Sequence, residues 1–256
     1  MPIYKKVEKI KNGGIYMRID KMLANSGFGS RKEVKKLLKT GAVQINDTVV
    51  KDPQTHLDPE VDQVTVHGEI VEYKEFIYLM MNKPSGVVSA TEDQNEETVI
   101  DLLEMEDQIF DPFPVGRLDK DTVGLLLLTN DGQLAHQLLS PKKHVPKTYY
   151  AKIAGLVSEK DIEAFKHGVT LDDGYTTKPA DLVILSTNEL ENKSEIELTI
   201  TDGKFHQVKR MFEAVNKKVT FLMRIKMGPL SLDESLKLGE YRELDEEEVE
   251  ALKQTT

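Results

Sequence analysis

Four consecutive leucines, at positions 125–128, constrain the fold more than any other feature of this chain. The run has no helical break and ends at the turn-forming sequence Asn-Asp-Gly of residues 130–132, so it predicts a short strand that is covered on both faces. Just before this strand, the sequence Gly-Arg-Leu-Asp of residues 116–119 places Asp119 beside Arg117. A stiff element would therefore hold an acidic side chain on the loop at the strand entrance.

Asp119 has two interpretations. A carboxylate beside a cation stays ionised and a loop exposes it, which fits a catalytic residue. A turn aspartate paired with Arg117 would give the same pattern, because perturbed acids mark functional sites only in a statistical sense. The spacing alone leaves both interpretations open.

Three blocks of sequence resemble the pseudouridine synthases of the small-subunit (RsuA-like) family. The first is the stretch around Asp119, the second is Lys-Thr-Tyr at residues 147–149, and the third is residues 203–211 followed by 224–228. They occur in the family's order within residues 17–244, whereas any one of them would be weak by itself. Lys83 is followed by Pro84, another feature of the family, at the start of its catalytic part.

The resemblance implies an isomerase that converts uridine to pseudouridine in 16S ribosomal RNA, with uridine 516 as the target. It implies that Asp119 is the catalytic residue, that Tyr149 stacks on the target base and that Lys209 pairs with Asp119. Many relatives have arginine at the position of Lys209, and lysine lacks the planar two-pronged contact of a guanidinium, so Arg210 or Arg224 are alternative partners. The run of residues 132–141 also favours the small-subunit branch over large-subunit (RluB/E/F-like) synthases of 23S RNA, which remain the alternative.

The reaction breaks the bond between the sugar carbon and the base nitrogen, rotates the base and rejoins it through carbon. One carboxylate can act as nucleophile or as base, and the sequence leaves both roles open. The target base has to leave its stack, with Arg117 a candidate to fill the gap or hold a phosphate. The aromatic face of Tyr149 would be a platform worth about 1–3 kcal/mol. Phe221, Leu222 and Ile225 are expected to wall the pocket.

Two rival functions come from other readings of the same residues. Asp119 and Asp121 would form a hydrolase pair, because paired carboxylates also cleave glycosidic bonds. A ribosome-assembly protein that binds RNA without catalysis is the second rival. The six histidines lack metal-ligand spacing and no phosphate-binding glycine loop is present, so neither a metal nor another cofactor is expected.

The composition fits a large domain joined to a small one. The chain has 256 residues, of which 39% are hydrophobic and 30% charged, and it has no cysteine. A soluble protein of the reducing cytoplasm is expected, because no apolar run approaches the length of a membrane span. The net charge of -10 is unusual for an RNA-binding protein, but the charges are segregated: residues 18–51 hold eight basic and three acidic side chains, and residues 92–111 hold nine acidic and no basic ones. Such polarity would direct a polyanion to one face.

The N-terminal part shows the pattern of a helix pair followed by a hairpin. Ser30 and Glu33 predict a capping box, Val34 and Leu38 an apolar helix face, and Gly41 the helix end. This part resembles the S4 RNA-binding module, whose helices present basic side chains to phosphates. The polar residues that would contact RNA here are Arg18, Lys21, Ser30, Arg31, Lys35, Lys36 and Lys39. Further RNA contacts are expected from Arg117, Lys147, Arg210 and Arg224.

We therefore predict an α+β protein with a small S4-type domain and a larger synthase domain that has a mixed, mostly antiparallel sheet. The expected divisions are an extension at residues 1–16, the S4-like domain with its linker at 17–74, and the synthase domain with an acidic tail at 75–256. Adjacent glycine codons before Met17 could encode a ribosome-binding sequence, which makes Met17 a candidate start. Residues 98–103 are expected to form a short helix. The partner is small-subunit ribosomal RNA, in an assembly intermediate, the protein is expected to be a monomer, and no membrane is involved.

Overall fold

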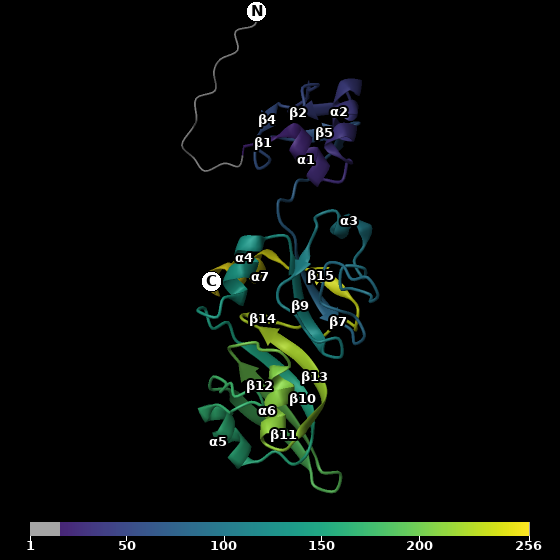
Figure 1. The fold of residues 1–256 in the computed structure, drawn as a ribbon. Helices are drawn as coiled ribbons and strands as arrows, with labels where there is room; N and C mark the ends of the chain where they lie inside the picture. The colour runs from purple at the N-terminus through teal and green to yellow at the C-terminus, as the bar shows by residue number, and fades with distance from the viewer. Residues whose placement is uncertain (1–15, 256) are drawn as a thin grey trace, which may run out of the picture. The chain divides into compact units, whose positions relative to one another are not determined.

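The structure is a computed structural model that describes residues 16–255. These residues form two compact units that divide between Glu75 and Phe76 (Figure 1). The sequence placed this division one residue earlier. The predicted N-terminal extension, and with it the proposal that Met17 is the start, falls outside the described residues except for Tyr16.

The first unit consists of two helices and short strands. The helices are α1 (Ile19–Asn25) and α2 (Arg31–Thr40). The strands are β1 (Met17–Arg18), β2 (Val43–Ile45), β3 (Thr48–Val49), β4 (His56–Leu57), β5 (Val64–Val66) and β6 (Glu69–Ile70). An antiparallel sheet has the order β3-β2-β5-β6, and β1 pairs with β4. The predicted helix pair and hairpin are both present.

The ends of α2 follow the sequence prediction. The Ser30 backbone N–H donates to Glu33 Oε2 at 2.8 Å, and the Ser30 hydroxyl accepts from the Glu33 backbone N–H, which completes the capping box. Gly41 ends the helix with φ of 81°, a left-handed conformation that favours glycine. Val34 and Leu38 are fully buried in the core of this unit. Burial of that face turns the lysines of α2 toward solvent.

The second unit is built on one large sheet. Its strand order is β11-β12-β10-β13-β9-β7-β15, with β14 paired to β13 and β8 to β9. Only β13 and β9 run parallel among the described strand pairs of this sheet. The sheet is therefore mixed and mostly antiparallel, as predicted. Its strands are β7 (Tyr78–Lys83), β8 (Phe113–Pro114), β9 (Val123–Thr129), β10 (Lys147–Ala154), β11 (Asp181–Asn188), β12 (Lys193–Ile200), β13 (Lys218–Met227), β14 (Leu230–Ser231) and β15 (Tyr241–Glu243).

Helices cover both faces of this sheet. The helices of this unit are α3 (Met105–Gln108), α4 (Gly132–Leu139), α5 (Glu159–His167), α6 (Gln207–Ala214) and α7 (Glu246–Thr255). Leu125 and Leu127 of β9 pack in one core with side chains of α4 and α7, whereas Leu126 and Leu128 pack in the other with side chains of α5 and α6. All residues of β9 are buried. The prediction of a strand covered on both faces is confirmed.

The prediction of a helix at residues 98–103 is wrong. These residues form a bridge and turns, and the short helix α3 begins only at Met105. Asp101 Oδ2 accepts from both the backbone N–H and the hydroxyl of Thr98, each at 2.8 Å. Such local side-chain bonds compete with helical backbone bonds. Val99 is fully buried in the core beside them, so tertiary packing supports the turn.

Candidate active site

A buried lysine holds the loop that carries Asp119. Lys83, at the end of β7, is 0% exposed, and its Nζ donates to the backbone oxygens of Pro84 at 2.9 Å, Asp119 at 3.2 Å and Thr122 at 3.1 Å. Burial lowers the pKa of Lys83 to about 8, although the charges of Asp121 and Asp119 oppose this shift. The three carbonyl groups are satisfied by one side chain, which keeps the loop in one conformation.

Two further contacts define the same loop. The Ser89 hydroxyl donates to the Leu118 oxygen at 3.0 Å and accepts from the Leu118 N–H at 3.1 Å. The Thr122 N–H donates to the Asp119 oxygen at 3.0 Å. The backbone on both sides of Asp119 is thereby held, and its side chain is left to face the site.

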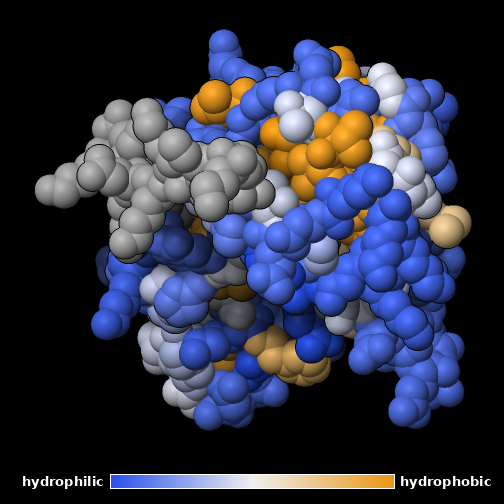
Figure 2. Space-filling model, turned by 90° about the horizontal axis from the view of Figure 1, so that it is seen from above, coloured by the Kyte–Doolittle hydropathy of each residue, from blue (hydrophilic) through white to orange (hydrophobic). Residues whose placement is uncertain are grey.

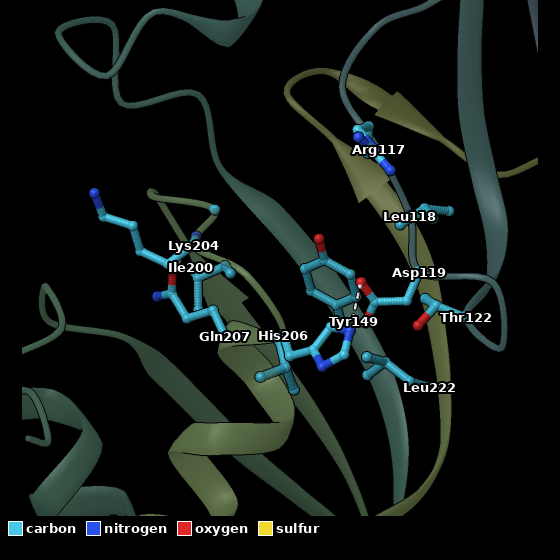
Figure 3. Close-up of a pocket in the computed structure, with 12 residues that line it drawn as sticks. Arg117, Leu118, Asp119, Thr122, Tyr149, Ile200, Lys204, His206, Gln207 and Leu222 are labelled. Carbon is cyan, nitrogen blue, oxygen red and sulfur yellow. Dashed lines mark hydrogen bonds and ion pairs between the residues drawn. The ribbon is translucent and has the colours of Figure 1, made fainter. Parts of the chain in front are cut away.

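The side-chain partners of Asp119 come from the start of α6. Lys209 Nζ lies 3.1 Å from Asp119 Oδ2, and His206 Nε2 lies 3.6 Å from Asp119 Oδ1. Figure 3 shows the carboxylate of Asp119 and the ring of His206 pointing toward each other beside Tyr149. The Asp119 side chain is 27% exposed. The predicted contact between Lys209 and Asp119 is present, while the catalytic role of either residue stays a prediction.

Lys209 also binds the second acid of the loop. Its Nζ lies 2.7 Å from Asp121 Oδ1, and this contact lowers the pKa of Asp121. Burial opposes the charge of Lys209, but the hydrogen bonds to Asp121 and Asp119 outweigh it and raise its pKa. Lys209 is therefore a cation shared by two carboxylates. The Asp121 side chain is 71% exposed.

A cavity of about 70 Å³ opens beside Asp119, and we call it the Asp119 cavity. Tyr149, from β10, is buried and forms part of its wall. Leu222 of β13 also lines it, but Phe221 and Ile225 do not, so that part of the prediction is wrong. Side chains alternate along a strand, and Phe221 instead contacts Tyr150 with ring centroids 6.1 Å apart. The complete lining is Arg117, Leu118, Asp119, Thr122, Tyr149, Ile200, Gly203, Lys204, His206, Gln207, Val208 and Leu222.

The alternative partners of Asp119 are engaged elsewhere. Arg210 forms ion pairs with Asp172 and with Asp173. Arg224 is 2% exposed, and its Nε donates to the Leu125 oxygen at 2.8 Å. Neither arginine contacts Asp119, so the pairing belongs to Lys209.

Gly124 explains how Arg224 comes so close to this loop. Gly124 of β9 pairs with Arg224 of β13, and a Cβ at this glycine would overlap the backbone of Arg224. Its φ of +102° also favours glycine. Glycine at this position therefore permits the parallel contact of the two strands.

His206 and Lys83 are site residues to which the sequence prediction assigned no role. His206 precedes α6 with φ of 49°, and its ring stacks on Phe205 with centroids 3.7 Å apart. Its position within the third block of the family resemblance was the available signal. Lys83 had a signal too, the Lys-Pro pair, but nothing local in the sequence shows that its amino group reaches residues 119–122.

The basic residues proposed for RNA binding in the first unit are mostly exposed. Arg18 differs, because it pairs with buried Asp20, its Nη2 lying 2.7 Å from Oδ2. Ser30 is occupied in the capping box of α2. The remaining five are exposed and form no salt bridge with a described residue: Lys21, Arg31, Lys35, Lys36 and Lys39. Figure 2 shows a face of the molecule on which hydrophilic residues surround smaller hydrophobic areas.

Within residues 16–255, no cluster of three or more histidine, cysteine or acidic side chains could hold a metal ion. No helix in that range is long and apolar enough to cross a membrane.

Comparison with known proteins identifies the family. Residues 77–214 match the model of the RNA pseudouridylate synthase family, and residues 17–62 match the S4 domain. The chain is 59% identical to the uncharacterized RNA pseudouridine synthase YtzG of Bacillus subtilis, covering 92% of this chain and 98% of the relative. It is 42% identical to ribosomal small subunit pseudouridine synthase A of Vibrio cholerae, covering 92% and 99%. It is 39% identical to ribosomal large subunit pseudouridine synthase B of Bacillus subtilis, covering 92% and 95%.

A solved structure agrees with these relatives. The crystal structure of a pseudouridylate synthase, 38% identical, superimposes with a TM-score of 0.64 and covers 92% of this chain and 99% of that one. The order of an S4 domain followed by a synthase domain is also the order of the two units described above. The chain belongs to the RsuA/RluB family of RNA pseudouridine synthases and is an isomerase.

Proposed function

We propose that this protein isomerises one uridine of 16S ribosomal RNA, at position 516, to pseudouridine in the cytoplasm. Asp119 is the catalytic carboxylate and acts on the sugar or base of the target nucleotide, either as nucleophile or as base. Tyr149 stacks on the extruded base, and Lys209 forms an ion pair with Asp119. The substrate is an assembly intermediate of the small subunit, and the protein acts as a monomer.

The ion pair between Asp119 and Lys209, beside a cavity walled by Tyr149, is the observation that carries this proposal. The loop backbone is held by Lys83 and Ser89, so the carboxylate needs no rearrangement to meet a bound nucleotide. Leu222 and Val208 add apolar surface to the wall and exclude water from the reacting atoms.

The choice of 16S RNA is supported by relatives named small subunit synthase A, at 42% identity in Vibrio cholerae and 39% in Haemophilus influenzae. A relative named large subunit synthase B, at 39% identity, favours 23S RNA as the second candidate. Residues 132–141 resemble the small-subunit synthases more than the large-subunit ones, and for this reason we propose 16S RNA as the substrate.

The hydrolase rival is disfavoured by the position of Asp121. This side chain is 71% exposed and is absent from the lining of the Asp119 cavity, and it meets Asp119 only in a more open pocket at the surface. A second catalytic carboxylate would have to face the same sugar as Asp119. Asp121→Asn should therefore retain near-normal isomerase activity.

The test is pseudouridine mapping of ribosomal RNA from cells that lack this gene and carry a plasmid-borne copy. We expect one small-subunit pseudouridine to disappear and to return with the natural protein and with Asp121→Asn, but not with Asp119→Asn. The purified Asp119→Asn protein should bind a 16S transcript with unchanged affinity. Loss of a large-subunit pseudouridine would support the second candidate. Return of the modification with Asp119→Asn would refute the assignment of that residue.

A further inference from the structure

A second cavity, of about 250 Å³, lies next to the Asp119 cavity. Both are lined by Arg117, Tyr149, Gly203 and Lys204, so they share a wall. Five cationic side chains line the second cavity, and we call it the basic cavity: Arg117, Lys147, Lys178, Lys204 and Arg224. The number of lysines and arginines distinguishes it from the Asp119 cavity, which is lined by two of them, Arg117 and Lys204, and by Asp119.

Arg224 is a buried cation without a counter-ion. It is 2% exposed, and no described carboxylate forms a salt bridge with it. Its Nε donates to the Leu125 oxygen, but its Nη2 is buried and has no hydrogen-bond partner among the described residues. A buried guanidinium nitrogen without a hydrogen-bond partner is costly, because it has lost water and gained no interaction in exchange. An anion in the adjoining cavity would compensate part of this charge.

Lys147 lies in the same electrostatic environment. Its Nζ donates to the Val145 oxygen at 3.0 Å. Burial, and after it the positive charge of Arg224, lowers the pKa of Lys147 to about 8. A buried arginine and a half-buried lysine that repel each other are therefore held at one side of the cavity, where a bound anion would favour the charged form of Lys147.

The acid in the lining of the basic cavity, Asp202, offsets these charges only in part: its charge opposes the lowering of the Lys147 pKa. Asp202 accepts a hydrogen bond from the Tyr175 hydroxyl at 2.9 Å and another from Gln207 Nε2. It forms no salt bridge with a cation of the described chain. Lys178 contacts His144 Nδ1 at 2.9 Å, and Lys204 lies over the Tyr175 ring. The cavity therefore keeps a surplus of positive charge.

We propose that the basic cavity binds a phosphate group of the RNA strand, next to the target uridine in the Asp119 cavity. Tyr149 lines both cavities. A base in the Asp119 cavity and a phosphate in the basic cavity would therefore belong to neighbouring parts of one RNA strand. Several cationic donors around one site suit a phosphate, which offers several acceptor oxygens. The identity of this phosphate as RNA rests on the proposed function, whereas the anion site itself rests on the structure.

Lys147→Met tests the site with two readouts on the full-length protein. The first is the melting temperature in inorganic phosphate against chloride at equal ionic strength. Lys152→Met is the matched control, because Lys152 lies on the same strand, is exposed and lines neither cavity. We expect phosphate to raise the melting temperature of the natural protein, of Lys152→Met and of Asp119→Asn more than that of Lys147→Met. Equal increases in Lys147→Met and the control would overturn the proposal.

The second readout is the affinity for a 16S transcript as a function of salt, with Asp119→Asn as the background so that no turnover occurs. Loss of one phosphate contact should lower the slope of log affinity against log salt by about 0.7–0.9 and weaken binding about tenfold at low salt. An unchanged slope with Lys147→Met would contradict the site. A natural protein that makes no pseudouridine would refute the proposed function, but it would leave the phosphate melting result valid, so the two failures are distinguishable.

Discussion

The two units of this protein use basic residues in opposite ways. In the first unit, Lys35 and Lys36 stand exposed on α2, because Val34 and Leu38 bury the other face of the helix. In the second unit, Lys83 is fully buried under the loop that carries Asp119, and Arg224 is 2% exposed. The same charge is thus presented to solvent in one unit and withdrawn from it in the other.

Exposed and buried basic residues are therefore expected to have different roles: the exposed ones attract RNA, and the buried ones position the groups around them. An exposed lysine is hydrated and screened by salt, so it attracts a phosphate without determining where that phosphate lies. A buried lysine has lost its water and depends on fixed partners, so it determines the position of the groups that surround it. Variants in the first unit should change affinity, whereas variants in the second should change turnover or stability.

The largest effect is expected for Lys209→Met. Asp119 would lose its charged partner at 3.1 Å, and we expect the rate of pseudouridine formation to fall about 10²–10³-fold. Single-turnover kinetics on a 16S transcript would measure this. Lys209→Arg keeps the charge and should recover part of the rate. A Lys209→Met protein with the natural rate would show that this half-buried cation behaves like an exposed one.

Lys83→Met should have the next largest effect. It would leave the carbonyls of Pro84, Asp119 and Thr122 without their donor, which should lower the free energy of unfolding by about 1–3 kcal/mol. Chemical denaturation of the full-length protein would measure the change.

Lys120→Met is the matched control for Lys83→Met. Lys120 lies in the same loop, but its side chain is 48% exposed and pairs with Glu96 at the surface. Such a pair contributes under about 1 kcal/mol. If both variants lost the same stability, burial would not distinguish the two lysines.

A pH effect of intermediate size is expected from Lys147. Burial lowers its pKa to about 8 from the usual lysine value of 10.5, so between these pH values the unfolded chain binds more protons than the folded one. The free energy of unfolding should therefore rise with pH in this window, and the penalty of burying the charge is fully present below pH 8. Relative to Lys147→Met, the natural protein should be less stable below pH 8 and recover above it. Parallel pH profiles of the two proteins would contradict this.

The smallest effect is expected for Lys35→Ala and Lys36→Ala. Each should weaken binding of the 16S transcript a few-fold and lower the salt slope by at most about 0.9, with the rate at saturating RNA unchanged. Lys160→Ala, which removes an exposed lysine side chain from α5, is the control variant. A loss of rate at saturating RNA would show that the lysines of α2 position the substrate after all.

Local patterns were the part of the fold that could be predicted from the sequence. The capping box of Ser30 and Glu33 depends on residues three apart, and it is present. The four leucines of β9 had to be buried on both faces, and they are. The helix at residues 98–103 failed because the bonds of Asp101 to Thr98 competed with it. Hydrophobic periodicity cannot show such a competition.

The candidate site was predicted in part. The family resemblance pointed to Asp119, Tyr149 and Lys209, and the structure brings these three together. It did not indicate that Phe221 would turn away from the cavity or that His206 would face Asp119. Both facts depend on how β13 and α6 meet the loop, which involves residues about 90 positions apart in the chain.

The sequence by itself determined the ends of α2, the strand β9, the faces that these two elements bury and the family that the residues around Asp119 resemble. Those properties follow from the order of apolar and polar side chains over a few residues. Only the tertiary structure decided the environment of each charge: Lys83 beneath the loop, Lys209 between two carboxylates and Arg224 beside an adjoining cavity. The sequence does not indicate whether a lysine or arginine is hydrated or buried, because its solvation is set by segments that are distant along the chain.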